Sequence, residues 1–486
     1  MSSAALQTFA ANAATTVADP GETTLELIRL FVLLVGAAAL VTLFARRINL
    51  PYTVALVAFG MAAGALAQPL RIDLTPQLVL VVLLPALIFE ASYQTDFEKL
   101  RPSLLGVSLL AGPGVLVSAA LVAVALNLGA GLPPAEAFIV GAMLAATDPV
   151  AVIATFKGLD SPRRLATLVE AESLFNDGTG IVAFSIAVAY VTTPVSPLQM
   201  GVAFVSVVAV SAAIGVVAGW AASRILPNVG DHLIEISLSV VLAYGTYLAA
   251  DAIHQSGVIA TAVAGIVLGN YGRRLGLSQR TKEALDTVWE FVAFLATAFV
   301  FLLIGFAITI GQLTDAAVAI AWAVAAAFAG RAIIVYGFLG AVRLVRRRVA
   351  SFEHRRSAER RRSAGVDRRR SGGVDRRLNE GDLPTGWLHV IYWSGLRGAV
   401  STALALSLPA DLPNRSLLQG ITFGVVLFTL LVQATTAELV VARWGRKPPR
   451  GPKAGSKAQA VEAQAVDAQA VDAQAVEPAT PSGSGR

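Results

Sequence analysis

Long apolar runs, separated by short breaks that are polar or contain proline or glycine, extend over most of the chain. A helix needs about 20 apolar residues to cross a bilayer, so each run of that length predicts a transmembrane helix. Thirteen runs meet this criterion, approximately at residues 25–45, 51–67, 77–94, 103–127, 134–156, 165–190, 199–223, 232–251, 255–271, 284–311, 314–343, 386–410 and 417–442. The pattern predicts an all-α polytopic membrane protein with about 13 transmembrane helices.

Basic residues fall into alternate loops between these runs. One set of short loops contains twelve Lys and Arg residues, whereas the other contains only Arg71 and Arg415, with Arg29 in the first turn of the first helix. Because Lys and Arg accumulate in cytoplasmic loops, the N-terminus is predicted outside and the C-terminus in the cytoplasm. A miscounted helix would have disrupted this alternation, which supports the count of thirteen.

The composition agrees with a membrane protein and excludes several other classes. Hydrophobic residues make up 55% of the 486 residues and charged residues only 14%, whereas charged residues are about a quarter of a soluble domain. The net charge of +6 could suggest a nucleic-acid partner, but residues 343–382 contain fourteen Arg and only six acidic residues. The rest of the chain is therefore slightly acidic, and no nucleic acid is expected. Cysteine is absent and the four histidines are widely spaced, which excludes disulfides, thiol chemistry and paired-histidine metal sites.

Three segments outside the apolar runs are predicted to lie in water. Residues 1–24 form an extracytoplasmic tail, and residues 344–383 form an Arg-rich cytoplasmic loop with too few apolar residues to fold. This loop either adheres to anionic lipid headgroups, at about 1 kcal/mol per Lys or Arg, or is a solvated insertion that only reinforces the topology. Residues 443–486 form a cytoplasmic tail with four Ala-Gln-Ala-Val-Glu/Asp repeats.

Ionisable residues inside the apolar runs are costly to bury, so each marks a candidate functional site. Glu90 lies in the third run, and Asp148 follows Thr147 in the fifth. Arg331 interrupts the eleventh run and Arg397 the twelfth.

The sixth run contains the densest polar group, formed by Glu172, Ser173, Asn176 and Asp177. Residues four apart share one helical face, so these side chains form a contiguous stripe. Carboxylate, amide and hydroxyl oxygens suit a hard monovalent cation better than a transition metal. The alternative is a stripe of interhelical hydrogen bonds that holds a helix bundle together.

Two runs contain sequences that interrupt a helix, Thr147-Asp148-Pro149 in the fifth and Gly395-Leu396-Arg397-Gly398 in the twelfth. Proline removes a backbone hydrogen bond and glycine weakens the next turn. An ordinary proline kink is one interpretation. However, the two runs occupy equivalent positions if runs 1–6 and 8–13 are inverted repeats, and paired broken helices point to a transport site at the membrane midplane.

These motifs, together with Phe89-Glu90 and Glu172-Ser173-x-x-Asn176-Asp177, resemble those of the cation:proton antiporter-1 family, the sodium/proton exchangers of the NhaP and NHE type. The resemblance covers about residues 25–442. It implies an NhaA-like antiporter fold with two inverted six-helix repeats and two crossed, broken helices. It also implies a core domain at about 103–190 and 314–442, dimerisation helices at about 25–94 and 199–311, and a homodimer.

The resemblance implies a role for each residue of the polar stripe. Asp177 would bind either the cation or the proton, and Ser173 and Thr147 would supply neutral oxygen ligands to Na⁺. Asn176 takes the position of a second aspartate in a related electrogenic family, which implies an electroneutral exchanger. Glu172 would form a buried ion pair, and the sequence leaves open whether its partner is Arg397 or Arg331.

Two further carboxylates receive roles from the resemblance. Asp148 would face the helix ends at the crossing, and Glu90 would lie close to the ion path.

The function implied by the resemblance is secondary sodium/proton antiport by alternating access, without enzymatic activity or a cofactor. Na⁺ or Li⁺ and H⁺ would be the transported substrates, and a bacterial inner membrane the location. The alternatives are a potassium/proton antiporter of the same fold and a cation channel. The Arg-rich loop and the lack of a large regulatory C-terminal domain depart from the family pattern.

Overall fold

The computed structural model describes residues 20–48, 50–66, 78–148, 152–153, 155–156, 159, 161–192, 196–275, 277–344, 348 and 384–445. The regular structure of these residues is entirely helical, which confirms the predicted all-α class. Several predicted segments lie outside the described residues: the first 19 residues, the segment directly after Asp148, nearly all of the Arg-rich loop and the tail from residue 446 onwards.

The first half of the described chain contains α2 (Pro20–Arg47), α3 (Tyr52–Leu66), η1 (Leu78–Leu83), α4 (Leu84–Gln94), α5 (Phe97–Leu100), η2 (Arg101–Ser103), α6 (Leu104–Leu109), η3 (Leu110–Gly114), α7 (Val115–Ala130), α8 (Pro134–Met143), α10 (Arg163–Thr192) and α11 (Pro197–Ile225). The second half contains η4 (Leu226–Asn228), α12 (His232–Asp251), α13 (Gly257–Val267), η5 (Leu268–Gly272), α14 (Gln279–Ala307), α15 (Ile310–Asp315), α16 (Ala317–Ala332), η6 (Ile333–Leu339), α19 (Thr385–Trp393), α20 (Ala399–Leu406), α21 (Arg415–Phe428), η8 (Thr429–Ala434) and α22 (Thr435–Trp444). Elements η2 and η4 are short 3₁₀ helices, and the other η elements are π-helical turns that continue a neighbouring α-helix.

Local sequence signals explain where several of these helices begin and end. The Asp231 side chain accepts hydrogen bonds from the first N–H groups of α12, and Ser196 and Gln199 form a capping box at the start of α11. Helix α7 ends at Gly131, which has a φ of 70°. Only glycine adopts this left-handed conformation without a Cβ penalty, so the sequence stops the helix there.

Seven helical segments of the described residues are long and apolar enough to cross a membrane: Phe97–Ala130, Arg163–Val191, Leu198–Asn228, His232–Asp251, Gln279–Ala307, Ala317–Leu344 and Arg415–Trp444. Four shorter apolar helices add to them: Tyr52–Leu66, Val79–Gln94, Pro134–Met143 and Gly257–Gly272. The two remaining predicted runs contain α2 and the pair α19 and α20. Each predicted run therefore contains a helix, while the number of membrane crossings stays a prediction.

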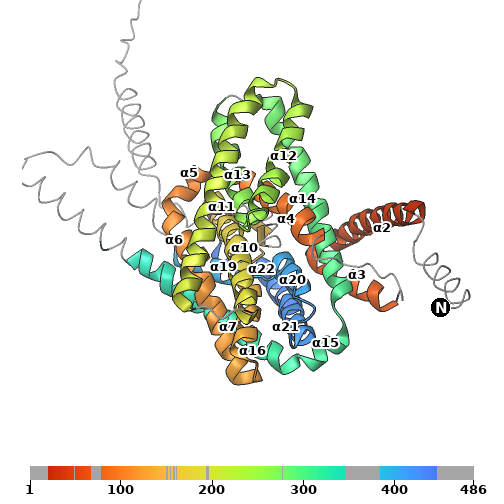
Figure 1. Ribbon diagram of the computed structural model, residues 1–486, viewed down its shortest axis with the longest axis vertical. Coiled ribbons are helices and arrows are strands. Elements are labelled where there is room, and N and C mark those ends of the chain that lie inside the picture. The colour runs from red at the N-terminus through yellow and green to blue at the C-terminus, as the bar shows by residue number, and fades with distance from the viewer. Residues whose placement is uncertain are drawn as a thin grey trace, which may run out of the picture. The chain divides into compact units, whose positions relative to one another are not determined.

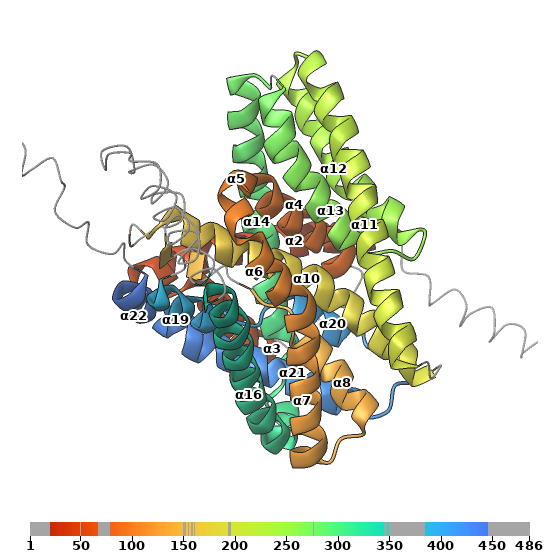
Figure 2. The same ribbon diagram turned by 90° about the vertical axis from the view of Figure 1, so that its left-hand side faces the viewer.

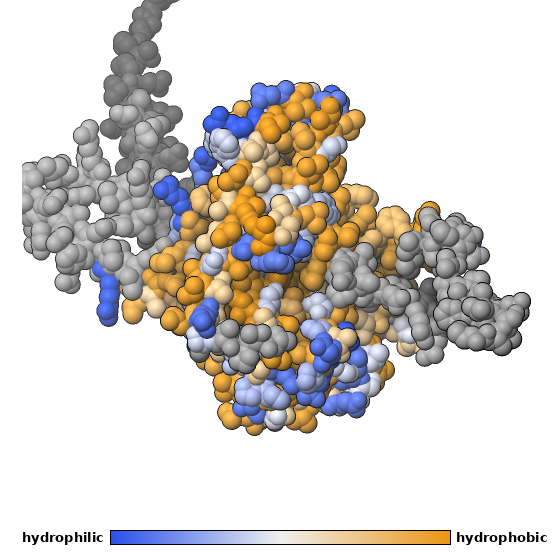
Figure 3. Space-filling view, viewed as in Figure 1, coloured by the Kyte–Doolittle hydropathy of each residue, from blue (hydrophilic) through white to orange (hydrophobic). Residues whose placement is uncertain are grey.

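The outer surface has the character expected of a membrane protein. Hydrophobic residues cover most of the face shown in Figure 3. Large apolar side chains on α2, α11 and α12 point outward, including Leu40, Leu198 and Leu233. Extensive apolar exposure of this kind is stable when lipid covers it.

Figures 1 and 2 both place α12 and α13 toward one end of the helical unit and α7, α16 and α21 toward the other. Helix α10 runs between these groups. A separate apolar cluster around Phe89, Tyr93 and Trp289 joins α4 to α12, α13 and α14. The ring centroids of Phe89 and Trp289 lie 4.5 Å apart.

Two interruptions in the helices meet beside α10. Residues 144–148, after α8, and residues 394–398, between α19 and α20, are not helical. The backbone N–H of Asp148 donates to the carbonyl oxygen of Leu396 at 2.8 Å and joins the two unwound segments. These are the two sequences from which helix breaks were predicted, and the hydrogen bond brings them together.

Candidate functional site

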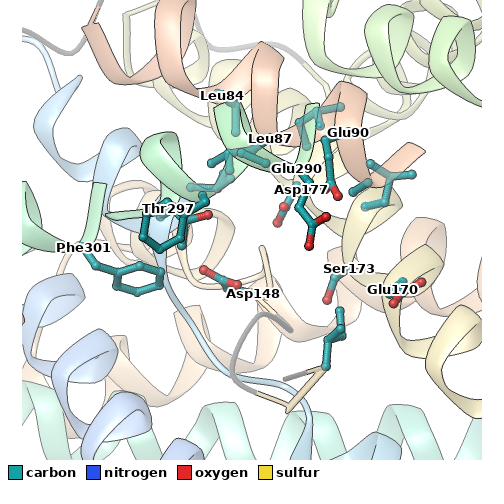
Figure 4. A pocket seen from close by; sticks show the side chains of 18 of the residues that line it. Leu84, Leu87, Glu90, Asp148, Glu170, Ser173, Asp177, Glu290, Thr297 and Phe301 are labelled. Carbon is teal, nitrogen blue, oxygen red and sulfur yellow. The ribbon is translucent and has the colours of Figure 1, made fainter. Parts of the chain in front are cut away.

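A cavity of about 410 Å³ lies beside the two unwound segments, lined by side chains of α2, α3, α4, α10, α14 and α20. Its oxygen-bearing lining residues include Glu90, Asp148, Glu170, Ser173, Asp177 and Glu290 (Figure 4). A water molecule takes about 30 Å³ of liquid, so the cavity holds on the order of ten waters. The cavity therefore has room for water around the Asp177 carboxylate.

Helix α10 contributes two polar side chains of the predicted site to the cavity lining. Ser173 and Asp177 are four residues apart, so they project from one face of the helix into the cavity. The carboxylate of Asp177 faces the backbone N–H of Thr147, and the charges of Asp148, Arg397 and Glu172 act on it. Asp177 thus combines cavity access with an oxygen-rich surrounding.

A chain of hydrogen bonds lies behind Ser173, away from the cavity. The hydroxyls of Thr147 and Ser173 are 3.0 Å apart. The amide nitrogen of Asn176 donates to Thr147 Oγ1 at 3.0 Å and to Glu172 Oε1 at 2.7 Å. Thr147, Asn176 and Glu172 are all buried and none of them lines the cavity. The side chain of Asn176 therefore links the site to the ion pair behind it.

Glu172 forms a two-point ion pair with Arg331. Arg331 Nη1 binds Glu172 Oε1, and Arg331 Nη2 donates to Glu172 Oε2 at 2.8 Å. The same Nη2 donates to the carbonyl oxygen of Ile391 at 2.6 Å, in the last turn of α19. Of the two arginines that the sequence left open, Arg331 is the one that binds Glu172.

Arg397 lies in the unwound segment between α19 and α20, and its side chain reaches the segment that follows α8. Its Nη1 donates to the carbonyl oxygens of Ala145 at 3.2 Å and Ala146 at 3.1 Å, and its backbone N–H donates to Thr429 Oγ1 at 3.1 Å. The last carbonyls of a helix lack intrahelical partners and carry partial negative charge. Arg331 therefore stabilises the carbonyl end of α19, and Arg397 binds carbonyl oxygens of the unwound segment that follows α8.

Asp148 lies beside the start of α20, where the second unwound segment, residues 394–398, ends. Helix α20 begins at Ala399 without a side-chain cap, and the Asp148 carboxylate lies beside Gly398, the residue before it. A carboxylate is favourable at a helix N-terminus because the first N–H groups carry partial positive charge. A Cβ atom on Gly398 would lie 2.7 Å from the Cβ of Asp148, so only glycine leaves room for this approach.

The structure thus divides the predicted site residues into two groups. Asp177, Ser173, Asp148 and Glu90 line the cavity, and Glu90 also accepts a hydrogen bond from Gln94 at 2.6 Å. The second group, which supports the site from behind, consists of Thr147, Asn176, Glu172, Arg331 and Arg397.

Three charged residues that the sequence analysis did not assign to the site also line the cavity: Glu170, Glu290 and Arg46. Glu290 lies within the predicted tenth run, so the cost of a carboxylate at membrane depth could have identified it. Glu170 lies at a similar depth in the predicted sixth run and gave the same signal, whereas Arg46 lies just past the end of the first run, where charges are common. Among the described lining residues, five carboxylates therefore face one guanidinium, which favours cations in the cavity.

Within the described ranges, no three His, Asp or Glu side chains are grouped as a metal site. The oxygen donors around Asp177 are instead a mixture of carboxylate and hydroxyl groups. Such hard oxygen donors suit a monovalent cation better than a transition metal. The small number of donors also suits an ion that has to be released again.

Comparisons with known proteins agree with this geometry. The Na(+)/H(+) antiporter ApNhaP of Aphanothece halophytica is 37% identical over 399 residues, covering 82% of this chain and 70% of the relative. The low-affinity Na(+)/H(+) antiporter NhaS1 of Synechocystis sp. is 36% identical over 395 residues, covering 81% of this chain and 69% of the relative. The solved structure of the sodium proton antiporter MjNhaP1 from Methanocaldococcus jannaschii has the same fold, with a TM-score of 0.67 at 18% identity over 87% of this chain and 100% of that one.

The description of the sodium/hydrogen exchanger transmembrane family matches residues 33–443, almost the whole helical part of the chain. The resemblance predicted from the motifs is thereby confirmed, as is the antiporter fold. By its sequence over that length, and by the broken helices that meet beside Asp177, this membrane protein belongs to the sodium/hydrogen exchanger family.

Proposed function

We propose that the protein is a secondary sodium/proton antiporter in which Na⁺ and H⁺ compete for the Asp177 carboxylate. The observation that carries the proposal is the placement of Asp177 and Ser173 side by side on the cavity wall, next to the point where the two unwound segments meet. Relatives that are more than a third identical are named Na(+)/H(+) antiporters. A carrier that changes state only when this carboxylate is neutralised exchanges the two cations.

Ser173 is the hydroxyl ligand that accompanies Asp177 in this mechanism. Thr147 supports the Na⁺ site from behind the cavity wall: its hydroxyl lies 3.0 Å from that of Ser173, and its backbone N–H faces Asp177. Glu90 and Asp148 add negative charge to the walls along which the ion arrives. The protein supplies these oxygens directly, and neither an enzymatic step nor a cofactor takes part.

The exchange is electroneutral, one Na⁺ for one H⁺. Asn176 carries no charge, and its amide donates to both Thr147 and Glu172. Glu172 is bound to Arg331, so its charge is matched by a buried guanidinium. Asp177 is thus the carboxylate of the stripe on which a cation and a proton can alternate.

The cavity faces the cytoplasm in this arrangement. Arg46 and Gln94 line it and lie at helix ends that the distribution of basic loops predicts to be cytoplasmic. The core helices, at about residues 103–190 and 314–442, move against the scaffold helices, at about 25–94 and 199–311, to expose the site on the other side. The protein acts as a homodimer in a bacterial inner membrane, and its Arg-rich loop lies near anionic lipids.

The test is transport by purified protein in liposomes, with Na⁺, Li⁺ and K⁺ supplied in turn at several pH values. The wild type is expected to collapse a pH gradient when Na⁺ is added, with saturation and without unitary currents. Asp177→Asn is expected to abolish this activity, whereas Asp315→Asn, the same change at the exposed end of α15, is expected to retain it. Full exchange by Asp177→Asn would refute the single-site mechanism, and K⁺-selective exchange or channel currents would point to the alternative functions.

A further inference from the structure

Residues 95–102 connect the predicted scaffold helix α4 to the predicted core helices that begin with α6. Thr95 is the C-cap of α4, and Asp96 is the N-cap of the short helix α5. If the core moves against the scaffold, this connection must absorb part of the movement, because chain continuity allows no separation here.

A single side chain holds the first part of this connection from another scaffold element. Asn270, in the π-helical turn after α13, accepts a hydrogen bond from the backbone N–H of Phe97 at 2.9 Å and donates to the carbonyl oxygen of Thr95 at 2.8 Å. Its amide also donates to Ile266 in its own helix at 2.8 Å. Both ends of the Asn270 amide are therefore used, and two of the three bonds fix backbone between α4 and α5.

Asn270 lies in a closely packed part of the scaffold. Gly269, next to it, lies against the backbone of Tyr93, and a Cβ atom there would come within 2.9 Å of the Tyr93 carbonyl carbon. Tyr93 in turn belongs to the apolar cluster that joins α4 to α12, α13 and α14. Asn270 thus belongs to the same packed group of helices as α4. It binds the backbone of Thr95 and Phe97, where the chain continues from this group toward α6.

The downstream end of the connection is attached to helices of the predicted core. Arg164, at the start of α10, donates to Ser103 Oγ at 3.4 Å and lies 5.9 Å from the ring of Trp387 on α19. Between the two attachments the chain changes from α-helix to a 3₁₀ turn at Arg101–Ser103, which contains Pro102. Residues 98–102 are therefore the part whose backbone can change direction while both of its ends stay bound.

We propose that Asn270 is a positioning residue for transport, which fixes the pivot about which the core helices move relative to the scaffold. The proposal rests on the alternating-access mechanism proposed above. With the pivot fixed, movement of the core is directed along one path between its two end states. With the pivot released, part of the molecules occupy arrangements that do not transport, and turnover falls in proportion to that fraction.

The first experiment compares Asn270→Ala with Asn270→Asp and with Asn228→Ala in liposomes. Asn228 is a matched control, because among the described residues its side chain bonds to the carbonyl oxygen of Arg224 in its own helical segment, at 2.7 Å. Loss of two backbone hydrogen bonds, each worth about fivefold, changes the equilibrium between the held and released pivot by about 25-fold, so turnover in Asn270→Ala should fall severalfold and by at most that factor. Asn270→Asp keeps the acceptor but loses the donor, so its turnover should be lower than that of the wild type but higher than that of Asn270→Ala.

The apparent KM for Na⁺ and the pH profile should be unchanged in these variants, because Asp177 and Ser173, which bind the ion, lie on α10. Wild-type turnover in Asn270→Ala would overturn the proposal, as would a KM that changes along with turnover. Failure of the wild type to exchange Na⁺ for H⁺ would instead refute the proposed function, so the two failures are distinguishable.

The second experiment uses the absence of native cysteine. Glu98 and Arg274 form an exposed ion pair across the same interface, so Glu98→Cys and Arg274→Cys can be joined by a short bifunctional thiol reagent. In the Asn270→Ala background this link replaces the lost attachment and should restore turnover. Inhibition by the link, or no recovery, would show that the interface has to open during transport and would overturn the proposal.

Discussion

The ion pair between Glu172 and Arg331 allows the clearest quantitative prediction. Only 1% of the Glu172 side chain and 8% of the Arg331 side chain are exposed, and the two are joined at two points. The perturbation is a set of three variants, Glu172→Gln, Arg331→Met and the two combined. Each single change leaves one buried charge without its main partner, whereas the double change removes both charges.

Removing one partner of a buried pair typically costs about 3–5 kcal/mol, while replacing both by neutral groups is often nearly neutral. Glu172 would keep only the hydrogen bond from Asn176 after Arg331→Met. Arg331 would keep its bond to Ile391 after Glu172→Gln. The two single changes are therefore expected to destabilise the protein by about 3–5 kcal/mol each, and the double variant by much less than their sum.

Thermal unfolding of the purified protein in detergent measures these changes, with all variants heated at one rate because unfolding of such a protein can be irreversible. The exposed pair Glu98 and Arg274 is the matched control, because an exposed ion pair is worth only about 0–1 kcal/mol. The equivalent neutralising variants there should leave the apparent Tm almost unchanged. Additive losses in the double variant Glu172→Gln/Arg331→Met would refute the assignment of Arg331 as the charge partner.

Further predictions concern close packing, charge balance and pH. Gly398→Ala should strongly reduce exchange, since its new Cβ would overlap Asp148, while Gly337→Ala, where nothing lies within 4 Å, should be tolerated; equal activity of the two variants would contradict the packing argument. Asn176→Asp should retain cation binding but produce a transport current on solid-supported membranes, and a silent trace would count against Asn176 as the determinant of electroneutrality. The hydrogen bond from Lys99 holds the pKa of Asp96, the N-cap of α5, below its ordinary value of 3.8, so this stabilisation is present above about pH 4 and is lost as the pH falls further. The protection factors of the α5 amides, which are corrected for the pH dependence of intrinsic exchange, should therefore fall on acidification in the wild type and not in Asp96→Ala; equal pH dependence in both would exclude the cap.

The sequence predicted much of the site because its strongest signals are local. The spacing of Ser173 and Asp177 by four residues places both on one face of a helix whatever the surrounding fold, and both line the cavity. The breaks at 144–148 and 394–398 follow from proline and glycine, whose backbone effects are also local. Burial cost made Glu90 stand out in the same way.

Other features of the site depend on contacts between distant parts of the chain. Glu172 and Arg331 are 159 residues apart, and the sequence offered Arg397 as an equally good partner. The absence of Thr147 and Asn176 from the cavity wall also follows from tertiary packing, because their side chains bond to neighbours behind the wall. Glu290 lines the same cavity as Asp177 because the tertiary structure brings α14 and α10 to that cavity.

The sequence by itself determined the class of the protein, the positions of its helices, its expected orientation and the stripe that carries Asp177. These depend on hydropathy, helical periodicity and the distribution of charge, which are properties of short segments. Only the tertiary structure decided which arginine matches Glu172, which carboxylates share the cavity, and that Asn270 holds the backbone between α4 and α5. A hydrogen bond or ion pair between residues far apart depends on the arrangement of whole helices, and no local pattern records that arrangement.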